Sequence, residues 1–336
     1  MLIDEQKMQS LQALRSQFSQ ILKDFASSKS SFRILRSIPG SPPLSSPISI
    51  LFVLDSSFNP PSRAHSSLVK SALSATQLPN SEESLGPGSS HASPPPPRVL
   101  FLLATVNADK KPKPADFEDR LVMMTLMAEE LRAGFSNQNS LSSQPQSQQL
   151  APVIDIGITK EPYFIDKATS IANSNLYRSC PSPNSPEDDV NNVVEQVHIT
   201  GFDTLTRIFT SRYYPQHDPP LSALEPFLSR HRIHATIRVE SNPANENDGD
   251  PESEFGTVEK QKGYLERLGR GALEDEGLKR EWVDRVQLAV DESGEAEGVS
   301  STSARECVKK GDLEKLRSFV GEGVKDWILA QGLYRE

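Results

Sequence analysis

The sequence predicts an α/β fold, a Rossmann-like parallel sheet with helices on both faces. Residues 48–54 form a nearly unbroken apolar run, which is typical of a strand buried on both sides. A polar turn follows, and then Leu68, Val69, Ala72 and Leu73 recur at helical spacing. Further apolar runs predict strands at 99–105, 152–159, 193–200, 233–240 and 282–290.

Helical patterns alternate with these runs, as a parallel sheet requires. We expect helices at 116–132, 163–172, 221–230, 258–268, 313–320 and 324–329. The chain has 336 residues and 26 prolines, with serine crowded into a few tracts, so we expect one core with loop insertions. The core is expected over 48–336, with low-complexity, disordered insertions near 79–98, 134–150, 179–192 and 241–255.

An N-terminal segment, 1–47, precedes this core. Residues 4–27 place apolar side chains such as Leu11 and Phe18 at helical spacing, which predicts an amphipathic helix. A short strand at 32–38 and a linker at 39–47 follow. We favour a helix packed on the core over one that binds a partner or a membrane surface.

Bulk properties exclude several classes of protein. The net charge of −9 argues against a general nucleic-acid binder or a binder of anionic membranes. Cys180 and Cys307 are far apart and have no metal-like spacing, which fits a reducing compartment. There is no apolar run that could span a bilayer and no apolar signal core at the N-terminus, so cytoplasm or nucleus is expected.

The turn after the first strand of the core predicts a phosphate site. Asn59, Pro60 and Pro61 prevent continuation of either strand or helix. A strand, a tight loop and a helix start together direct backbone N–H groups and the helix dipole at an anion. His65 lies where the helix would begin, so we expect its imidazole to point at the same anion.

A second stretch, near the C-terminus, has a related character. Ser300, Ser301 and Thr302 precede a helical pattern, and such hydroxyls can cap the helix and also donate to phosphate oxygens. Arg305, one turn further on, adds a fork of donors over the same place. An ordinary serine-capped helix with a surface arginine remains the alternative for this stretch alone.

Other candidates are weaker on their own. Lys110 and Lys111 follow the second strand of the core and are either phosphate ligands or a solvated basic loop. Gly201 would permit close backbone approach, and Asp203 would accept from a ribose hydroxyl or cap a helix. Tyr163 and Phe164 would stack on a flat base or pack in the core. His231 and His234 are three apart on a strand and so face opposite sides, which argues against a metal site.

Together these residues resemble a known family. Ser56-Ser-Phe-Asn-Pro-Pro-Ser-Arg-Ala-His65 resembles the Gly-Ser-Phe-Asn-Pro…(Thr/His)-x-x-His signature of nucleotidylyltransferases. The other matches are to nicotinamide mononucleotide adenylyltransferases, in family order: Asn107–Arg120 to their lysine-rich loop and helix, Gly201-Phe-Asp203 to Gly-Ala-Asp, Val299–Arg305 to Ile-Ser-Ser-Thr-x-x-Arg, and Val324–Tyr334 to their ending. The resemblance runs from about Ile48 to Tyr334 and indicates a divergent, fungal branch.

The sequence also departs from the family pattern. Ser56 replaces the first glycine, and Ser62 stands where threonine or histidine is usual. The tryptophans that sandwich nicotinamide in the family are not found; Tyr213 and Tyr214 follow the Gly-x-Asp helix instead, and tyrosine can also stack. The ATP half of the site is therefore better supported than the acceptor half.

The resemblance implies transfer of the adenylyl group of ATP to nicotinamide mononucleotide, giving NAD and pyrophosphate. It implies Mg²⁺ held through ATP phosphates and water, with no dedicated metal ligands and no nucleic-acid or membrane partner. The alternatives are another acceptor or ATP hydrolysis at the same site, or a non-catalytic nucleotide-binding interaction protein. The residues expected to act are His65, Ser62 and Arg305 in catalysis; Ser57, Phe58, His65, Lys110, Lys111, Gly201, Asp203, Ser301, Thr302 and Arg305 with ATP; and Ser57, Phe58 and Tyr163 with the acceptor.

Overall fold

The computed structural model describes residues 4–40, 48, 50–75, 96–106, 115–141, 150–177, 193–237, 257–291 and 298–335. Much of the four predicted insertions lies outside these residues. No helix in the described ranges is long and apolar enough to cross a membrane.

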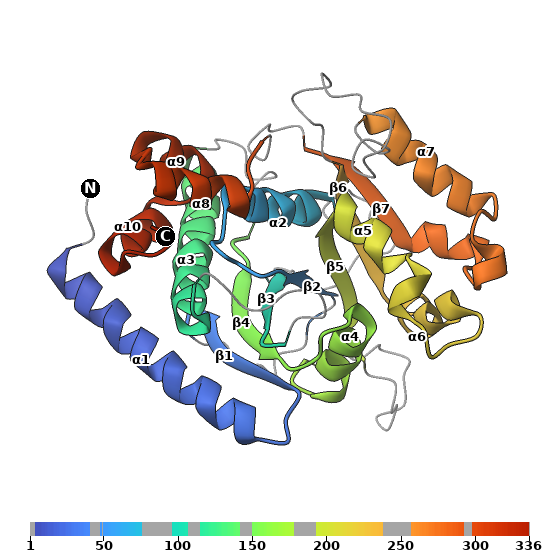
Figure 1. Cartoon of the computed structure of the whole chain (residues 1–336), viewed down its shortest axis with the longest axis horizontal. Coiled ribbons are helices and arrows are strands. Elements are labelled where there is room, and N and C mark those ends of the chain that lie inside the picture. Colours follow the sequence, from blue (N-terminus) through green and yellow to red (C-terminus); the bar gives the residue numbers. More distant parts are fainter. Residues whose placement is uncertain are drawn as a thin grey trace, which may run out of the picture.

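A seven-stranded sheet runs through the middle of the structure (Figure 1). Its strand order is β1-β4-β3-β2-β5-β6-β7, and every neighbouring pair is parallel except β1 and β4. The predicted parallel α/β fold is therefore confirmed, with an antiparallel strand added at one edge. The strands are β1 (Phe32–Ile38), β2 (Ile50–Asp55), β3 (Arg98–Ala104), β4 (Val153–Thr159), β5 (Glu195–Gly201), β6 (Arg232–Ile237) and β7 (Val286–Val290).

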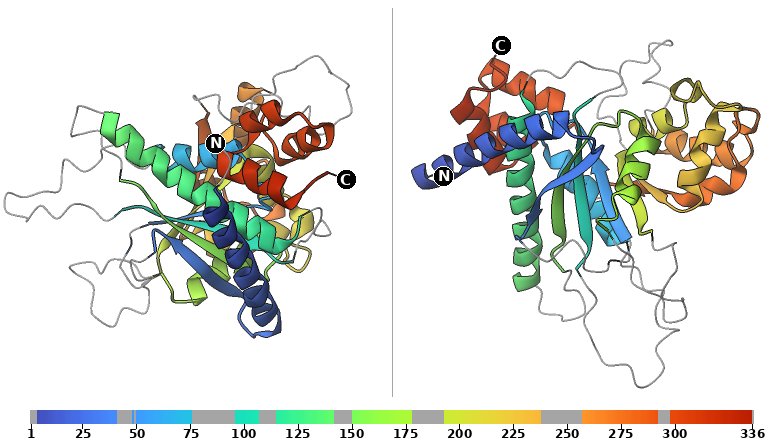
Figure 2. Two further views of the ribbon diagram at one scale, coloured as in Figure 1. Left: turned by 90° about the vertical axis from the view of Figure 1, so that its left-hand side faces the viewer. Right: turned by 90° about the horizontal axis from the view of Figure 1, so that it is seen from below.

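Helices cover both faces of the sheet (Figure 2). Alternate residues of β2 show why: Phe52 and Leu54 belong to the core under one layer of helices, and Leu51 and Val53 to the core under the other. The first layer contains α1 (Glu5–Ser27), α2 (Arg63–Ala75), α3 (Phe117–Leu141), α8 (Ser301–Lys310), α9 (Leu313–Phe319) and α10 (Glu322–Gln331). The second contains α4 (Phe164–Asn173), α5 (Phe202–Ile208), α6 (Glu225–Leu228) and α7 (Val258–Gly269).

The N-terminal helix α1 packs along the outside of the first layer (Figure 1). Its buried residues Leu11, Phe18 and Phe25 join the core that α3 also lines. Arg15 adds a fork of two hydrogen bonds, 2.8 and 3.0 Å long, to the buried carboxylate of Asp119 in α3. The packed position favoured from the sequence is the one observed.

Several predicted boundaries are wrong. Helix α3 continues to Leu141, through residues expected to open an insertion, because Phe135 is buried and anchors the extra turns. The last strand begins at Val286, since Trp282 lies in a 3₁₀ helix, Arg280–Arg285. The helix expected at 221–230 is divided between a 3₁₀ helix, Pro220–Leu224, and the single turn of α6, with Pro226 in that turn.

Arg98 is a further correction, because it was expected at the end of an insertion. It is the first residue of β3, only 2% exposed, and its guanidinium donates to both carboxylate oxygens of Asp155 at 2.7 and 3.0 Å. Tyr177 and Ser37 also donate to Asp155. These bonds satisfy a charge pair that would otherwise be costly to bury.

Candidate active site

The sheet has a switch point between β2 and β5. These strands are parallel neighbours, but the chain leaves β2 into α2 on one face and leaves β5 into α5 on the other. Open α/β sheets bind ligands in the crevice that such a divergence creates at the carboxyl ends of the strands. The loop that follows β2, with His65 in the first turn of α2, lies at this edge.

His65 is held from both sides of its ring. The backbone N–H of Ser62 donates to Nδ1 at 3.0 Å, and the Ser62 hydroxyl lies 2.9 Å from the same atom. Nε2 is 2.9 Å from the hydroxyl of Ser56. Because a backbone N–H can only donate, we assign Nδ1 as the acceptor, which places the proton of the neutral ring on Nε2. The half-buried imidazole therefore presents an N–H donor at the carboxyl edge of the sheet.

Phe58 shapes the loop from inside. Its side chain is fully buried, and its ring centroid lies 5.1 Å from that of His65. Its φ of 45° falls in the left-handed region that non-glycine residues rarely adopt. Only the backbone of Phe58 is thus left for a ligand, whereas the neighbouring Ser57 is exposed.

The two predicted phosphate motifs meet at this loop. Arg305 of α8 donates through Nη1 to the Asn59 carbonyl at 2.6 Å, and through Nη2 to the Thr302 hydroxyl at 3.0 Å. The Ser301 hydroxyl donates to the Pro60 carbonyl at 2.8 Å. Arg305 and Ser301 thus contact the loop that carries His65, and the convergence of His65 and Arg305 on one triphosphate stays a prediction.

Tyr334 supports the same loop from the end of the last helix. Its hydroxyl donates to Oδ1 of Asn59 at 2.8 Å, and both side chains are buried. Burial raises the pKa of Tyr334, so the hydroxyl stays protonated and remains a donor at neutral pH.

Arg120 of α3 is a contributor that the sequence analysis did not single out. Its side chain is 4% exposed; Nε donates to the Ala115 carbonyl at 3.0 Å, and Nη1 lies 3.5 Å from the Ser57 carbonyl. Burial lowers its pKa, and Nη2 has no hydrogen-bond partner within the described ranges. A buried cation thus lies directly behind the loop.

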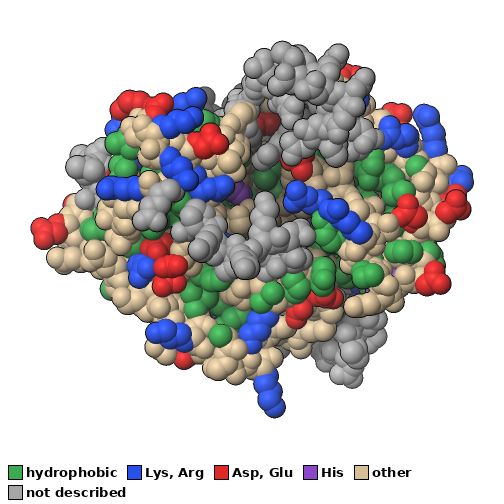
Figure 3. Space-filling model, viewed as in Figure 1, with side chains coloured by type: hydrophobic (Ala, Val, Ile, Leu, Met, Phe, Trp, Pro, Cys, Tyr) green, Lys and Arg blue, Asp and Glu red, His purple; other side chains and the backbone are tan. Residues whose placement is uncertain are grey.

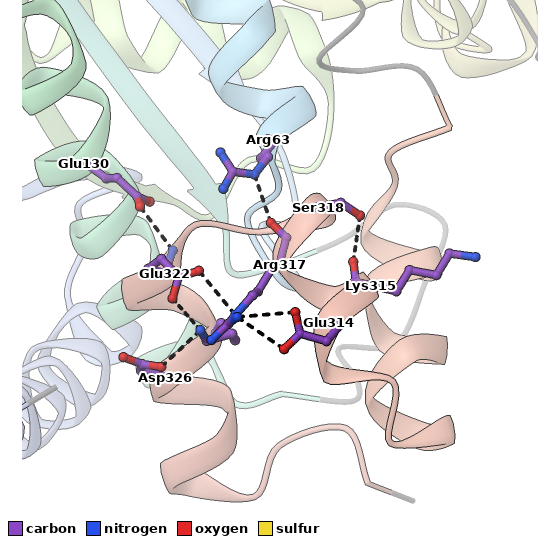
Figure 4. A network of polar contacts seen from close by, with 9 residues as sticks. Arg63, Glu130, Glu314, Lys315, Arg317, Ser318, Glu322 and Asp326 are labelled. Atoms are coloured by element: carbon purple, nitrogen blue, oxygen red, sulfur yellow. Dashed lines mark hydrogen bonds and ion pairs between the residues drawn. The ribbon is translucent and has the colours of Figure 1, made fainter. Parts of the chain in front are cut away.

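Helix α8 begins as the sequence predicted. Ser300 caps it, its hydroxyl accepting from the Ser303 N–H at 3.0 Å. Arg63, the first residue of α2, donates to the Arg317 carbonyl in α9 at 3.1 Å, within the polar network of Figure 4. In the space-filling view, Lys and Arg side chains gather in the region of α8 and border a histidine side chain (Figure 3).

The network of Figure 4 also fixes the C-terminal helices. Arg317 donates to the Glu314 carboxylate at 3.2 and 3.3 Å, and Lys325 pairs with Glu322. The backbone N–H of Glu322 donates to Glu130 of α3 at 3.1 Å. These contacts join α9 to the start of α2 and α10 to the side of α3.

On the other side of the crevice, β2 ends in an ion pair. Lys167 of α4 places Nζ 2.5 Å from Oδ2 of Asp55, the residue directly before Ser56. Tyr163, immediately before α4, is 44% exposed and remains available to a ligand. Phe164 instead packs against the rings of His198 and Phe227, with centroids 4.8 Å from each, so it belongs to the core.

Other candidates take ordinary structural positions. Asp203 is exposed in the first turn of α5, which Gly201 precedes as N-cap with an extended backbone. Tyr214 is buried and donates to the Ile208 carbonyl at 2.8 Å, so it packs in the core and does not stack on a ligand. Lys110 and Lys111 lie outside the described residues.

The two histidines near β6 have separate partners. His231 accepts through Nδ1 from the Gln196 N–H at 3.1 Å, whereas Nε2 of His234 lies 3.0 Å from the Ser71 hydroxyl. Over the described ranges there is no group of three His, Cys, Asp or Glu side chains that could hold a metal ion.

Comparison with known proteins gives one relative over most of the chain. No family model matches the sequence. The chain is 29% identical over 285 residues to the "Putative nicotinamide mononucleotide adenylyltransferase" of Schizosaccharomyces pombe, which spans 85% of this chain and 86% of that protein. This relative confirms the resemblance that the motifs predicted.

Solved structures with some likeness carry related names. A Plasmodium falciparum nicotinic acid mononucleotide adenylyltransferase complexed with APC is 12% identical with a TM-score of 0.43, covering 85% of this chain and 98% of that one. The "Putative Nicotinate-nucleotide Adenylyltransferase" of Vibrio parahaemolyticus is 12% identical with a TM-score of 0.31, covering 86% and 97%.

Proposed function

We propose that this protein is an adenylyltransferase that transfers the adenylyl group of ATP to a pyridine mononucleotide, nicotinamide mononucleotide, to make NAD. The observation that carries the proposal is the contact between its two phosphate-type motifs, in which Arg305 and Ser301 of α8 donate to the Asn59 and Pro60 carbonyls of the His65 loop. Two helix starts that meet at the carboxyl edge of a parallel sheet suit a triphosphate. The name of the Schizosaccharomyces relative supports the same reaction.

The proposed chemistry requires positioning and charge stabilisation. A phosphate oxygen of the acceptor attacks the α-phosphorus of ATP in line; the new oxygen–phosphorus bond forms as the bond to the β-phosphate breaks, and pyrophosphate leaves. The attacking phosphate is already ionised, so no protein nucleophile or general base is needed. ATP enters as its Mg²⁺ complex, with the ion held by phosphate oxygens and water.

His65 is the donor proposed for the α- and β-phosphates. The Ser62 contacts to Nδ1 leave the proton on Nε2, so a neutral ring donates to a phosphate oxygen without exchanging protons. The hydroxyl of Ser56 lies 2.9 Å from Nε2, and the phosphate oxygen would take its place there. Ser62 acts by orienting the ring and so is assigned a positioning role.

The outgoing pyrophosphate is assigned to the start of α8. Ser301, Thr302 and Arg305 lie within its first turns, next to the His65 loop. Donors that are already fixed need little reorganisation as charge moves onto the leaving group. Lys110 or Lys111 would add charge neutralisation, and Gly201 with Asp203 would hold the ATP ribose.

The acceptor is assigned to the opposite side of the loop. The backbone of Ser57 and Phe58 would contact its phosphate, and the exposed ring of Tyr163 would stack on its base. Tyr163 would thereby provide the stacking surface that the tryptophans provide in the related family.

An acceptor assay tests this proposal. The full chain is incubated with ATP and Mg²⁺, alone and with nicotinamide mononucleotide or another nucleoside monophosphate, and pyrophosphate, phosphate and dinucleotide are measured together. NAD and pyrophosphate in equal amounts, dependent on nicotinamide mononucleotide, are expected. Release of phosphate without dinucleotide would show that the protein hydrolyses ATP and would overturn the proposal. If the protein neither turns over nor binds ATP, a non-catalytic interaction protein would be the better description.

A further inference from the structure

The Asp55–Lys167 ion pair lies at the carboxyl end of β2, and the reaction as described above does not use it. Asp55 follows Leu51 and Val53 in the alternation of the strand and faces the layer that contains α4. Nζ of Lys167 lies 2.5 Å from Oδ2 of Asp55. The Lys167 side chain is 11% exposed and that of Asp55 24%, so the carboxylate is the more accessible member of the pair.

This pair lies between two elements assigned to the acceptor. Asp55 lies two residues before Ser57, whose backbone is assigned to the acceptor phosphate. Lys167 lies one helical turn after Tyr163, and its backbone N–H donates to the Tyr163 carbonyl at 3.1 Å. An acceptor whose phosphate meets the Ser57–Phe58 backbone and whose base stacks on Tyr163 would therefore extend past the Asp55 carboxylate.

The charge of that carboxylate distinguishes the two natural forms of a pyridine acceptor. Both carry a cationic pyridinium ring, but one has a neutral carboxamide and the other a carboxylate. An aspartate beside the bound acceptor attracts the pyridinium ring and accepts a hydrogen bond from the amide NH₂ group. The same aspartate repels the carboxylate of the acid form at short range. Lys167 keeps Asp55 fixed at this edge through the contact of its Nζ with Oδ2, and of the two side chains the carboxylate is the more exposed.

We propose that Asp55, positioned by Lys167, is the specificity-determining residue that selects the amide acceptor over the acid. This inference rests on the proposed adenylyl transfer. It assigns a role to a residue at which the sequence motifs gave no indication, and it identifies the substrate class by the charge of one substituent.

The test compares kcat/KM for nicotinamide mononucleotide and nicotinic acid mononucleotide in the full chain. The wild type should prefer the amide. Asp55→Asn keeps the shape and a carbonyl acceptor but removes the charge, so the amide-to-acid ratio should fall by about tenfold or more, mainly through better use of the acid. Lys167→Met keeps the charge of the carboxylate but removes its positioning partner, so the amide-to-acid ratio should fall less than in Asp55→Asn.

A matched control comes from an ion pair at the amino-terminal ends of the strands, away from the proposed site. Glu195 and Arg232, the first residues of β5 and β6, form a bidentate pair of 2.7 and 3.0 Å. Glu195→Gln should leave the acceptor ratio unchanged, and melting temperatures report the folding of every variant.

Each other outcome is decisive. An unchanged ratio in Asp55→Asn, or an equal loss with both acceptors, would overturn the specificity role while leaving adenylyl transfer intact. An equal change of the amide-to-acid ratio in Asp55→Asn and Lys167→Met would show that the pair acts only by supporting the local structure. Failure of the wild type to use either acceptor would instead overturn the proposed function, and this inference with it.

Discussion

The hydroxyl of Tyr334 donates a 2.8 Å hydrogen bond to Oδ1 of Asn59, a residue 275 positions earlier in the chain. The backbone carbonyl of Asn59 also accepts a 2.6 Å hydrogen bond from Arg305. Both Asn59 and Tyr334 are 5% exposed. The loop that orients His65 is thus supported by two elements from the far end of the sequence, and its conformation depends on their docking.

Tyr334→Phe should therefore weaken both folding and turnover. The change removes the Tyr334 hydrogen bond to the buried Oδ1 of Asn59, which costs about 1–3 kcal/mol of unfolding free energy. Loosening of the loop should lower kcat by roughly tenfold, since catalytic geometry tolerates little displacement. Urea denaturation and steady-state kinetics measure the two effects.

Tyr214→Phe is the matched control for that variant. Tyr214 is also buried and donates to a backbone carbonyl, that of Ile208, but lies away from the loop. It should lose stability with unchanged kcat. If both variants lose activity to the same extent, Tyr334 has no special relation to the site.

His65→Ala should lower kcat by roughly two to three orders of magnitude, the usual loss when one transition-state donor is removed. The half-buried ring contributes little to the core, so the melting temperature should change little. His217, an exposed histidine, provides the control: His217→Ala should retain full turnover. Near-wild-type kcat in His65→Ala would remove His65 from the mechanism.

Tyr163→Ala should raise KM for the acceptor by roughly tenfold, as expected for the loss of one stacking contact, and leave KM for ATP unaltered. Tyr163→Phe keeps the ring and should restore the wild-type KM. Initial rates at varied acceptor and saturating ATP measure the difference. A rise in KM for ATP would show that Tyr163 faces the other substrate.

Folding stability should fall as the pH is lowered from about 7 to 4. Burial lowers the pKa of His231 to about 4, and it also lowers the pKa values of His198 and His234. These histidines bind protons near pH 6.5 in the unfolded chain but only at lower pH in the folded chain. The native state therefore loses stability as the pH falls below about 6.5. His231 alone accounts for about 3 kcal/mol when the pH has dropped below its folded pKa.

Thermal unfolding across this pH range tests the effect. His231→Asn keeps an acceptor for the Gln196 N–H but does not titrate, so its stability should fall less steeply. The exposed control His217→Asn should follow the wild type. Equal slopes in all three proteins would contradict the assignment to His231.

The sequence predicted the strands of the sheet and the capped start of α8 because both depend on local patterns. Apolar runs locate β2 and β3, and the hydroxyl-rich start of α8 marks a cap that the structure contains. The resemblance to the nucleotidylyltransferase family led to the further prediction that His65 and Arg305 converge on one triphosphate. Periodicity was less informative at element ends: Phe135 extends α3 because it finds a core to pack against.

The remaining parts of the site arise from tertiary contacts that no local pattern contains. Asp55 and Lys167 are 112 residues apart, and Arg120 reaches the Ser57 carbonyl across 63 residues. A carboxylate at the end of an apolar strand and an arginine early in a helix are unremarkable until the sheet brings them to one edge.

One triphosphate should lie between the His65 loop and the start of α8. A crystal structure with Mg²⁺ and a non-hydrolysable ATP analogue tests it most directly. Phosphate oxygens are expected within hydrogen-bonding distance, about 3 Å, of both His65 Nε2 and the α8 donors Ser301, Thr302 or Arg305. A triphosphate bound elsewhere on the molecule, with neither His65 nor α8 in contact with it, would contradict the account.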